Sequence, residues 1–390
     1  MIYSDFKGLK LSRLGFGAMR LPMIGNEIDE EQVARMVDLA MERGVNYFDT
    51  AYPYHGGESE RVLGRVLASY PRESYYLATK FPGHQLASSY NPAQIFEEQL
   101  EKCGVDYFDF YLLHNVYDKS MPTYLDPRWG ILDYFVEQQK KGRIRHLGFS
   151  THGTVEWMEE FLNRCGEHME FCQIQLNYLD WTLQRAEEKC ALLARHNIPV
   201  WVMEPLRGGK LAALSPENEA KLKALRPQEG VPAWAFRWLQ GIDNVKVILS
   251  GMSTYAQMQD NVNTFEQCAP LNEEENQALM DVAESLKNSV PCTGCRYCCD
   301  GCPMGLDIPR ILASYNDFRY AASFNAYMWL EGEPEDKRPS ACIGCGKCAQ
   351  ICPQGIDIPG AMKDFADRIA EQPSWAQICR EREEAAKRKS

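Results

Sequence analysis

The sequence lacks the features that mark membrane, secreted and nucleic-acid-binding chains. No apolar run among its 390 residues approaches the ~18 to 20 residues that a membrane-spanning helix needs. The opening stretch MIYSDFKGLKLSRLG has no long apolar core of the signal-peptide kind. Basic residues are too few for a polyanion-binding surface, because 42 Lys and Arg against 54 Asp and Glu give a net charge of −12. We therefore expect a cytoplasmic protein with no membrane span and no nucleic-acid partner.

Cysteine, by contrast, is abundant but unevenly placed, which excludes a regular disulfide framework. Of 15 cysteines, nine lie between Cys292 and Cys352. We expect the scattered ones to be small buried residues or inert thiols. These are Cys103, Cys165, Cys172, Cys190, Cys268 and Cys379. With 45% hydrophobic and 25% charged residues the chain has an ordinary globular composition, so only the cysteine cluster suggests special chemistry.

Short β-type runs alternate with helical patterns from about residue 12 to residue 266. Such alternation is typical of βαβ units that build a parallel sheet. Eight strand and helix pairs in this length predict a (β/α)8 TIM barrel, whose chemistry lies at the carboxyl ends of the strands. The predicted strands are residues 14–19, 47–50, 75–81, 108–114, 146–150, 172–178, 199–205 and 245–251, with helices at 30–43, 58–69, 92–103 and 185–196 among others.

The sequence divides into three predicted parts. Residues 1–266 form the barrel and open with a hairpin whose turn is Lys7-Gly8. Residues 267–291 are predicted to be one amphipathic linking helix that starts at Asn272 and ends before Pro291. Residues 292–390 form a mostly helical, two-cluster ferredoxin-like domain.

The third part contains an internal repeat. CTGCRYCCDGCPMGLDIP at 292–309 and CIGCGKCAQICPQGIDIP at 342–359 share their cysteines at an offset of 50 residues. Each copy reads C-x2-C-x2-C-x3-C-P, the run of two-cluster bacterial ferredoxins in which the fourth cysteine ligates the other cluster. Zinc is the alternative, but it does not require the third and fourth cysteines or the proline. We therefore predict two [4Fe-4S] clusters bound by Cys292, Cys295, Cys298, Cys302, Cys342, Cys345, Cys348 and Cys352, with Cys299 as a spectator thiol.

Polar residues stand at the ends of consecutive predicted barrel strands. Asp49 ends the second strand and Tyr54 follows it, Lys80 ends the third, and His114 ends the fourth. Each one alone has an ordinary structural explanation as a cap, a packed ring or a satisfied core residue. Together they converge on one mouth of the barrel, which favours a catalytic interpretation.

These residues lie in segments that resemble the aldo/keto reductase family: DTAYPYHGGESE, LATKF, YLLHN, HLGFS, QIQLNY and SGMSTYAQMQDN. The resemblance covers about residues 2–266. With the cysteine repeats, the chain resembles the branch that carries a C-terminal iron-sulfur domain, and that domain resembles the helical ferredoxin type of respiratory dehydrogenases. The resemblance implies that Tyr54 is the general acid, Lys80 lowers its pKa, Asp49 pairs with Lys80 and His114 orients the carbonyl.

These roles also make chemical sense. A phenol with a pKa near ~10 is a poor proton donor at neutral pH unless an adjacent ammonium stabilises the phenolate. A buried carboxylate can keep that ammonium charged. Tyr52 is the competing phenol, and its spacing from Asp49 favours Tyr54 instead.

The resemblance implies a nicotinamide coenzyme, NADPH or NADH. The implied coenzyme residues are Ser150, Gln175, Leu206, Gly208, Lys210, Gly251, Ser253, Gln257 and Asn261. Thr151 and Met203 depart from the family pattern beside the nicotinamide. Positions 252 and 257 lack the basic residue that often binds a 2′-phosphate, and Arg20, Arg207 or Lys210 are the alternatives.

Aromatic residues after the fourth and sixth strands either roof a substrate pocket or pack loops onto the protein. They are Tyr117, Tyr124, Trp129, Tyr178 and Trp181. The leading functional prediction is an oxidoreductase that interconverts a small-molecule carbonyl and an alcohol by hydride transfer. The alternatives are an electron-transfer protein that exchanges single electrons with a flavin or a partner, and a non-catalytic module whose clusters are structural.

Overall fold

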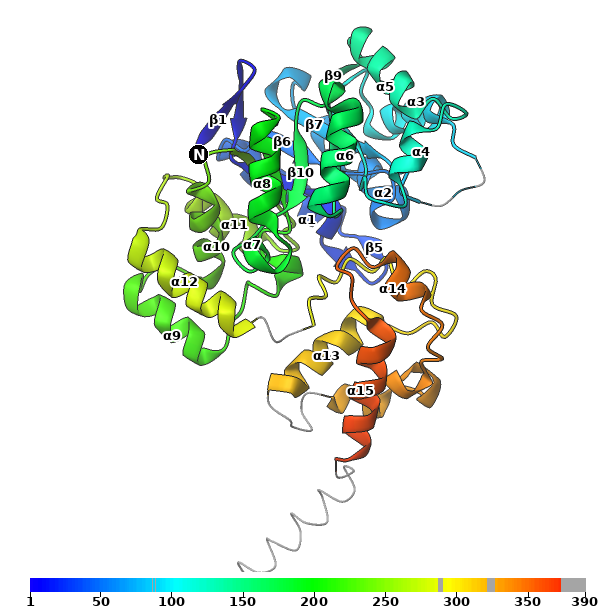
Figure 1. The fold of residues 1–390 in the computed structure, drawn as a ribbon. Helices are drawn as coiled ribbons and strands as arrows, with labels where there is room; N and C mark the ends of the chain where they lie inside the picture. Colours follow the sequence, from blue (N-terminus) through cyan, green and yellow to red (C-terminus); the bar gives the residue numbers. More distant parts are fainter. Residues whose placement is uncertain (86, 88, 287–289, 321–326, 373–390) are drawn as a thin grey trace, which may run out of the picture. The chain divides into compact units, whose positions relative to one another are not determined.

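The computed structural model describes residues 1–390 except 86, 88, 287–289, 321–326 and 373–390 (Figure 1). The chain divides into two compact units, Met1–Ser285 and Leu286–Ser390. The first contains a closed parallel barrel, and the second is built from helices and cysteine-bearing loops.

The barrel confirms the predicted fold class. Its eight strands are hydrogen-bonded in the order β10-β11-β12-β3-β6-β7-β8-β9, so the ring is closed and every pairing is parallel. All eight predicted strands are present. They are β3 (Leu14–Gly17), β6 (Tyr47–Asp49), β7 (Tyr76–Phe81), β8 (Phe108–Leu113), β9 (Ile144–Thr151), β10 (Cys172–Gln175), β11 (Val200–Met203) and β12 (Val245–Ser250).

Strands β10 and β11 end earlier than their sequence pattern predicts, and each has a local cause. After β10, the Asn177 side-chain oxygen accepts hydrogen bonds from the backbone N–H groups of Leu179 and Asp180, which turns the chain. After β11, Glu204 adopts a left-handed φ of 57°, which no strand accommodates. Both turns place polar side chains at the carboxyl end of the barrel.

The amino-terminal end of the barrel is closed by the predicted hairpin of β1 (Tyr3–Phe6) and β2 (Leu9–Ser12). Lys7 and Gly8 both have positive φ, 49° and 85°, as a two-residue hairpin turn requires. Phe6 is buried in a core with Trp201, and their rings meet edge-on at 5.1 Å. A second small hairpin, β4 (Met23–Ile24) and β5 (Glu27–Ile28), follows β3.

Helices surround the strands, and the predicted ones at 30–43, 58–69, 92–103 and 185–196 are confirmed. The helices of the first unit are α1 (Glu30–Glu42), α2 (Glu58–Leu67), α3 (Pro92–Cys103), α4 (Met121–Leu125), α5 (Ile131–Lys140), α6 (Val155–Cys165), α7 (Asp180–Leu183), α8 (Ala186–Arg195), α9 (Pro216–Leu225), α10 (Val231–Gln240), α11 (Tyr255–Thr264) and α12 (Glu273–Leu286).

Helix α12 begins where the sequence predicted, directly after Asn272. The Asn272 side chain accepts from the Glu275 N–H while the Glu275 carboxylate accepts from the Asn272 N–H. This reciprocal pair is a capping box, which fixes the start of the helix. The boundary between the two units falls after Ser285, and residues 287–289 lie outside the described residues.

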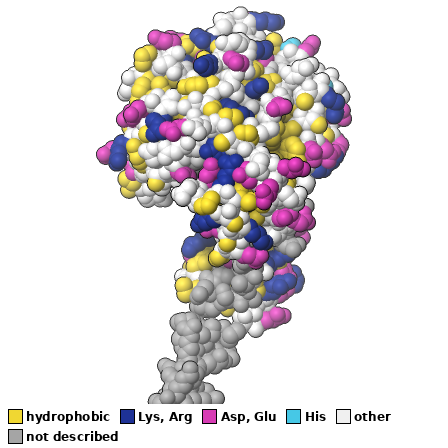
Figure 2. All heavy atoms as spheres, turned by 90° about the vertical axis from the view of Figure 1, so that its left-hand side faces the viewer, with side chains coloured by type: hydrophobic (Ala, Val, Ile, Leu, Met, Phe, Trp, Pro, Cys, Tyr) yellow, Lys and Arg dark blue, Asp and Glu magenta, His cyan; other side chains and the backbone are white. Residues whose placement is uncertain are grey.

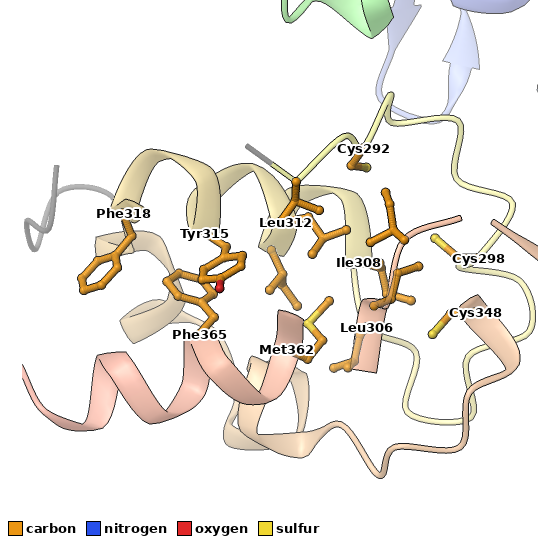
Figure 3. Packing of buried hydrophobic residues seen from close by; sticks show 14 of the residues in the cluster. Cys292, Cys298, Leu306, Ile308, Leu312, Tyr315, Phe318, Cys348, Met362 and Phe365 are labelled. Carbon is orange, nitrogen blue, oxygen red and sulfur yellow. The ribbon is translucent and has the colours of Figure 1, made fainter. Parts of the chain in front are cut away.

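The second unit has a hydrophobic core between α13 (Ile308–Tyr320) and α15 (Ile358–Ala370), with α14 (Lys347–Ile351) beside them. The repeated Asp-Ile-Pro explains the start of the two long helices, because Pro is favoured in the first turn. In α15 the Asp357 side chain accepts from the Gly360 N–H as the N-cap. Figure 3 shows aromatic rings, including Phe365, at one end of this core and cysteine sulfurs at the other.

The surface carries charges of both signs. On the face in Figure 2, Asp and Glu side chains lie beside Lys and Arg side chains, with hydrophobic and uncharged groups between them. Across the described part of the chain, no helix has both the length and the apolar character needed to cross a membrane.

Candidate functional site

The four residues predicted to be catalytic come together at the carboxyl end of the barrel. Asp49 is the last residue of β6, Lys80 lies in β7, and His114 directly follows β8. Tyr54 follows β6 in a short turn, Tyr54–Gly57, where His55, Gly56 and Gly57 all have positive φ. Two glycines make this left-handed turn accessible, and it returns Tyr54 toward the strand ends.

Lys80 is the centre of the group. Its Nζ lies 2.5 Å from Asp49 Oδ1, 2.7 Å from the Thr50 carbonyl oxygen and 3.4 Å from Tyr54 Oη. The Lys80 side chain is fully buried and that of Asp49 nearly so. An ammonium in such surroundings needs a paired charge and hydrogen-bond acceptors, and Asp49 and Thr50 supply both.

Burial controls the pKa values here. It lowers the pKa of Lys80 and raises that of Asp49, and each partner's charge opposes the effect on the other. Burial, then the carboxylates of Asp49 and Glu204, raise the pKa of Tyr54 well above 10. This net direction differs from the implied lowering by Lys80, because burial is the largest effect and the two carboxylates add to it. Tyr54 is therefore a protonated phenol at neutral pH.

His114 faces the phenol. Its ring meets the Tyr54 ring at a right angle, with centroids 5.9 Å apart, and its pKa is lowered well below 6.5 by burial and by neighbouring His84, Lys80 and His152. A neutral imidazole has one N–H donor to offer. His114 Nδ1 is buried and has no hydrogen-bond partner in the described structure.

The competing phenol points elsewhere. Tyr52 Oη donates to Glu98 at 2.9 Å, and the Lys102 ammonium lies 3.9 Å from its ring centre. The geometry therefore brings Tyr54, and not Tyr52, to Lys80.

A buried network behind Lys80 was missed by the sequence reasoning. Glu60, on α2, accepts from Thr79 Oγ1 at 2.6 Å and from Gln99 Nε2 at 2.7 Å. Gln99 also donates to the carbonyl oxygen of Lys80 at 3.1 Å and accepts from Tyr111. These bonds fix the backbone of β7 at the residue that carries the ammonium. Glu60 in the HGGESE run was the only available signal.

The nine predicted coenzyme residues also follow the carboxyl ends of strands. Ser150 is the second-to-last residue of β9, and its Oγ accepts a hydrogen bond from the Asn115 N–H at 2.9 Å. Gln175 ends β10, and its Nε2 donates to Asp180 at 2.7 Å. Leu206, Gly208 and Lys210 lie in the turn after β11, and Gly251, Ser253, Gln257 and Asn261 lie after β12 and in α11.

The residues after β12 form a helix start without a basic side chain. The Ser253 N–H donates to Gln257 Oε1 at 2.7 Å, and Met252 is buried. Asn261 is turned toward the strand, where its Nδ2 donates to Ser250 at 2.9 Å. The exposed end of α11 thus offers backbone donors, which suit an anion.

Arg207 is not the free cation that the sequence suggested for a 2′-phosphate. It is almost fully buried, and its Nε lies 3.0 Å from Asp180 Oδ2. Asp180 also accepts from Gln175 and Asn177. The Arg207–Asp180 pair therefore links the turn after β11 to Gln175 at the end of β10.

Most of the loop aromatics pack against protein. Tyr124 is buried, and its hydroxyl donates to the carbonyl oxygen of His114 at 2.6 Å. The Trp129 ring meets the Tyr90 ring edge-on, and the Trp181 ring meets the Trp238 ring edge-on. Tyr178 is also buried. All four therefore pack against other parts of the protein.

The second unit brings the eight repeat cysteines around two cavities. One is lined by Cys342, Cys345 and Cys348 of the second repeat and Cys302 of the first. The other is lined by Cys292, Cys295 and Cys298 of the first repeat and Cys352 of the second. We call them the second-repeat and first-repeat cavities. Each therefore takes its fourth cysteine from the other repeat.

Each cavity is lined by four cysteines, which is the number of protein ligands that an iron-sulfur cube takes. The additional Cys299 lies beside Cys298 but is not among the lining residues of either cavity.

Family models match both units. The aldo/keto reductase family model matches residues 13–284, which is more than half of the chain. The chain belongs to the aldo/keto reductase family. A 4Fe-4S dicluster domain model matches residues 291–356, so this reductase carries a C-terminal iron-sulfur domain.

Two curated relatives and one solved structure are similar to this chain at 25% to 28% identity. An NADH-specific methylglyoxal reductase of Escherichia coli is 25% identical over 325 residues, which cover 72% of this chain and 97% of that protein. A probable aldo-keto reductase of Glycine max is 28% identical over 56% of this chain, and the match spans 64% of the soybean protein. A solved aldo-keto reductase of Bacillus halodurans, in its holo form, has a TM-score of 0.57 at 28% identity, over 70% of this chain and 93% of that one.

Proposed function

We propose that this oxidoreductase interconverts a small carbonyl compound and its alcohol with NADH or NADPH, and that its second unit holds two [4Fe-4S] clusters. The single observation that carries the reductase proposal is the placement of the Lys80 ammonium between a buried carboxylate and the Tyr54 hydroxyl. When bound, the nicotinamide supplies or accepts the hydride.

The residues of the chain handle the proton. Tyr54 Oη holds a proton at neutral pH and donates it to the carbonyl oxygen, leaving a phenolate that the Lys80 ammonium stabilises. Asp49 keeps Lys80 charged and in place. His114, being neutral, donates a hydrogen bond that orients the carbonyl oxygen.

The coenzyme end of the site supports a nicotinamide nucleotide. Ser150 and Gln175 are polar side chains at adjacent strand ends, beside the catalytic group, and suit the carboxamide. The uncharged positions 252 and 257 offer nothing to a 2′-phosphate, which agrees with the NADH specificity in the name of the E. coli relative. We therefore propose that the enzyme accepts both coenzymes, with a preference for NADPH over NADH no greater than ~10-fold.

The cysteine cavities support two clusters with crossed ligation. Cys292, Cys295, Cys298 and Cys352 would hold one cluster, and Cys342, Cys345, Cys348 and Cys302 the other. Thiolates at four corners of a cavity match the requirements of an iron-sulfur cube.

Replacement of Tyr54 tests the catalytic assignment. Tyr54→Phe removes only the proton donor, so carbonyl reduction should fall by ~10²- to 10⁴-fold while the Kd for NADH stays within twofold by protein fluorescence. Tyr52→Phe is the matched control and should keep wild-type activity with small aldehydes such as methylglyoxal. The reverse pattern would contradict the proposal.

Electron exchange by the clusters is a second proposed activity, favoured by the exposure of Cys345, which lines the second-repeat cavity. Dithionite-reduced protein, mixed with substrate or coenzyme or a ferredoxin-like acceptor, should show reoxidation of the cluster absorbance. If none of the three reoxidises the clusters, they have a structural role.

A further inference from the structure

An acidic residue stands where the turn after β11 begins. Glu204 has a left-handed φ of 57°, which is unfavourable for a residue with a Cβ. Its carbonyl oxygen accepts from Asn177 Nδ2 at 2.9 Å and from the Arg207 N–H at 3.0 Å. The surroundings therefore hold a strained backbone that aims this side chain.

The Glu204 carboxylate lies beside two donors. Arg20 Nη2 lies 3.4 Å from Glu204 Oε1, and the backbone N–H of Gly208 is close enough to lower the pKa of the carboxyl. Among the described residues Glu204 Oε2 is buried without a hydrogen-bond partner. The side chain is only 11% exposed, so this is not a solvated surface pair. The same carboxylate raises the pKa of Tyr54, which places it near the catalytic group.

Both donors lie beside residues that the family resemblance implies for the coenzyme. Gly208 is itself one of them, in the turn after β11 that the resemblance places along the pyrophosphate. Arg20 lies over Gly251, because a Cβ at that glycine would come within 3.2 Å of the Arg20 side chain, and the Arg20 carbonyl accepts from Ser253 at 2.8 Å. The Arg20–Glu204 pair thus joins the turn after β11 to the residues before α11.

We infer that Glu204 competes with the coenzyme diphosphate for Arg20 and Gly208, and so sets the nucleotide affinity of the enzyme. A carboxylate and a phosphate accept from the same donors, a guanidinium and a backbone N–H. A diphosphate therefore binds only by displacing the carboxylate or by lying against its negative charge. The inference rests on the proposed function, since it assumes a nicotinamide coenzyme beside this pair.

The test is nucleotide binding to the full-length, cluster-loaded protein. Glu204→Gln keeps the size of the side chain and removes its charge, and Glu204→Ser is a second variant in case the first is unstable. Each should lower the Kd for NADH and NADPH by ~10- to 100-fold, the equivalent of one charge-assisted hydrogen bond. Glu137→Gln, in an exposed pair with Lys141 on α5, is the matched control and should leave both Kd values unchanged.

Arg20→Met gives an independent readout. It removes a donor as well as the partner of Glu204, so it should not tighten binding as Glu204→Gln does. Equal Kd values for wild type and both Glu204 variants, or weaker binding by both variants, would overturn the inference and leave the proposed function intact. If no protein in the set binds either nucleotide, the proposed function fails along with it.

Discussion

Replacing Cys352 should damage the cluster of the first repeat. The first-repeat cavity is lined by Cys292, Cys295, Cys298 and Cys352, so Cys352→Ala leaves three thiolates there and all four in the other cavity. If a cluster with three cysteines is lost during purification, iron and acid-labile sulfide fall from about eight to about four per chain. Cys302→Ala should have the same stoichiometric effect through the second-repeat cavity.

Pairs of substitutions distinguish crossed from uncrossed ligation. Cys352→Ala combined with Cys295→Ala should be no worse than either alone, because both remove ligands from one cavity. Cys352→Ala combined with Cys345→Ala should lose both clusters. The electron paramagnetic resonance spectrum of dithionite-reduced Cys352→Ala should match that of Cys295→Ala. The crossed arrangement would be refuted by a spectrum that matches Cys345→Ala, together with loss of both clusters in the Cys352→Ala, Cys295→Ala double variant and of only one in the Cys352→Ala, Cys345→Ala double variant.

Three further predictions concern single side chains. Lys80→Met removes the charge that lowers the pKa of Asp49, so the Asp49 carboxyl keeps a proton in the folded state that the unfolded state releases above about pH 4. The free energy of unfolding, measured by denaturant titration, should then fall with rising pH by up to about 1.4 kcal/mol per pH unit. Asp49→Asn in the same chain should remove this slope. Cys299→Ser should leave the iron count unchanged, whereas loss of iron would make Cys299 a ligand. The wild-type preference for NADPH over NADH should stay within ~10-fold. Gln257→Arg should add a charge-assisted contact to the 2′-phosphate and raise the ratio of the two Kd values by ~10- to 100-fold. A wild-type preference above a thousandfold would reveal an unidentified cation.

Local sequence was sufficient to predict the barrel. Its strands are short apolar runs separated by helical patterns, and both signals are set by neighbours in the sequence. The errors lie where side chains cap the backbone. Asn177 ends β10 early, because its side-chain oxygen accepts from the Leu179 and Asp180 N–H groups. Such ends depend on individual hydrogen bonds that periodicity does not contain.

The site was predictable only where a motif marks it. Asp49, Tyr54, Lys80 and His114 were found because they end consecutive strands. Glu204 and Gln99 were missed, because their partners Arg20 and Glu60 lie far away in sequence and meet them only in the closed barrel. The direction of the Tyr54 pKa shift could not be predicted from the sequence either, since it depends on how deeply the phenol is buried.

The two cysteine repeats of the second unit resemble two joined copies of one half, because each contributes one cysteine to the cavity of the other. Cys302 and Cys352 each complete the other repeat's cavity, and residues 50 apart, such as Pro303 and Pro353, occupy matching places in the two walls. This is the self-complementary pattern of an isologous dimer, in which each half gives what it receives. Under the proposed crossed ligation, a single repeat expressed alone would have three ligands for one cluster and a fourth cysteine that ligates the other. It would then have to assemble as a symmetric homodimer to give a cluster the same four ligands.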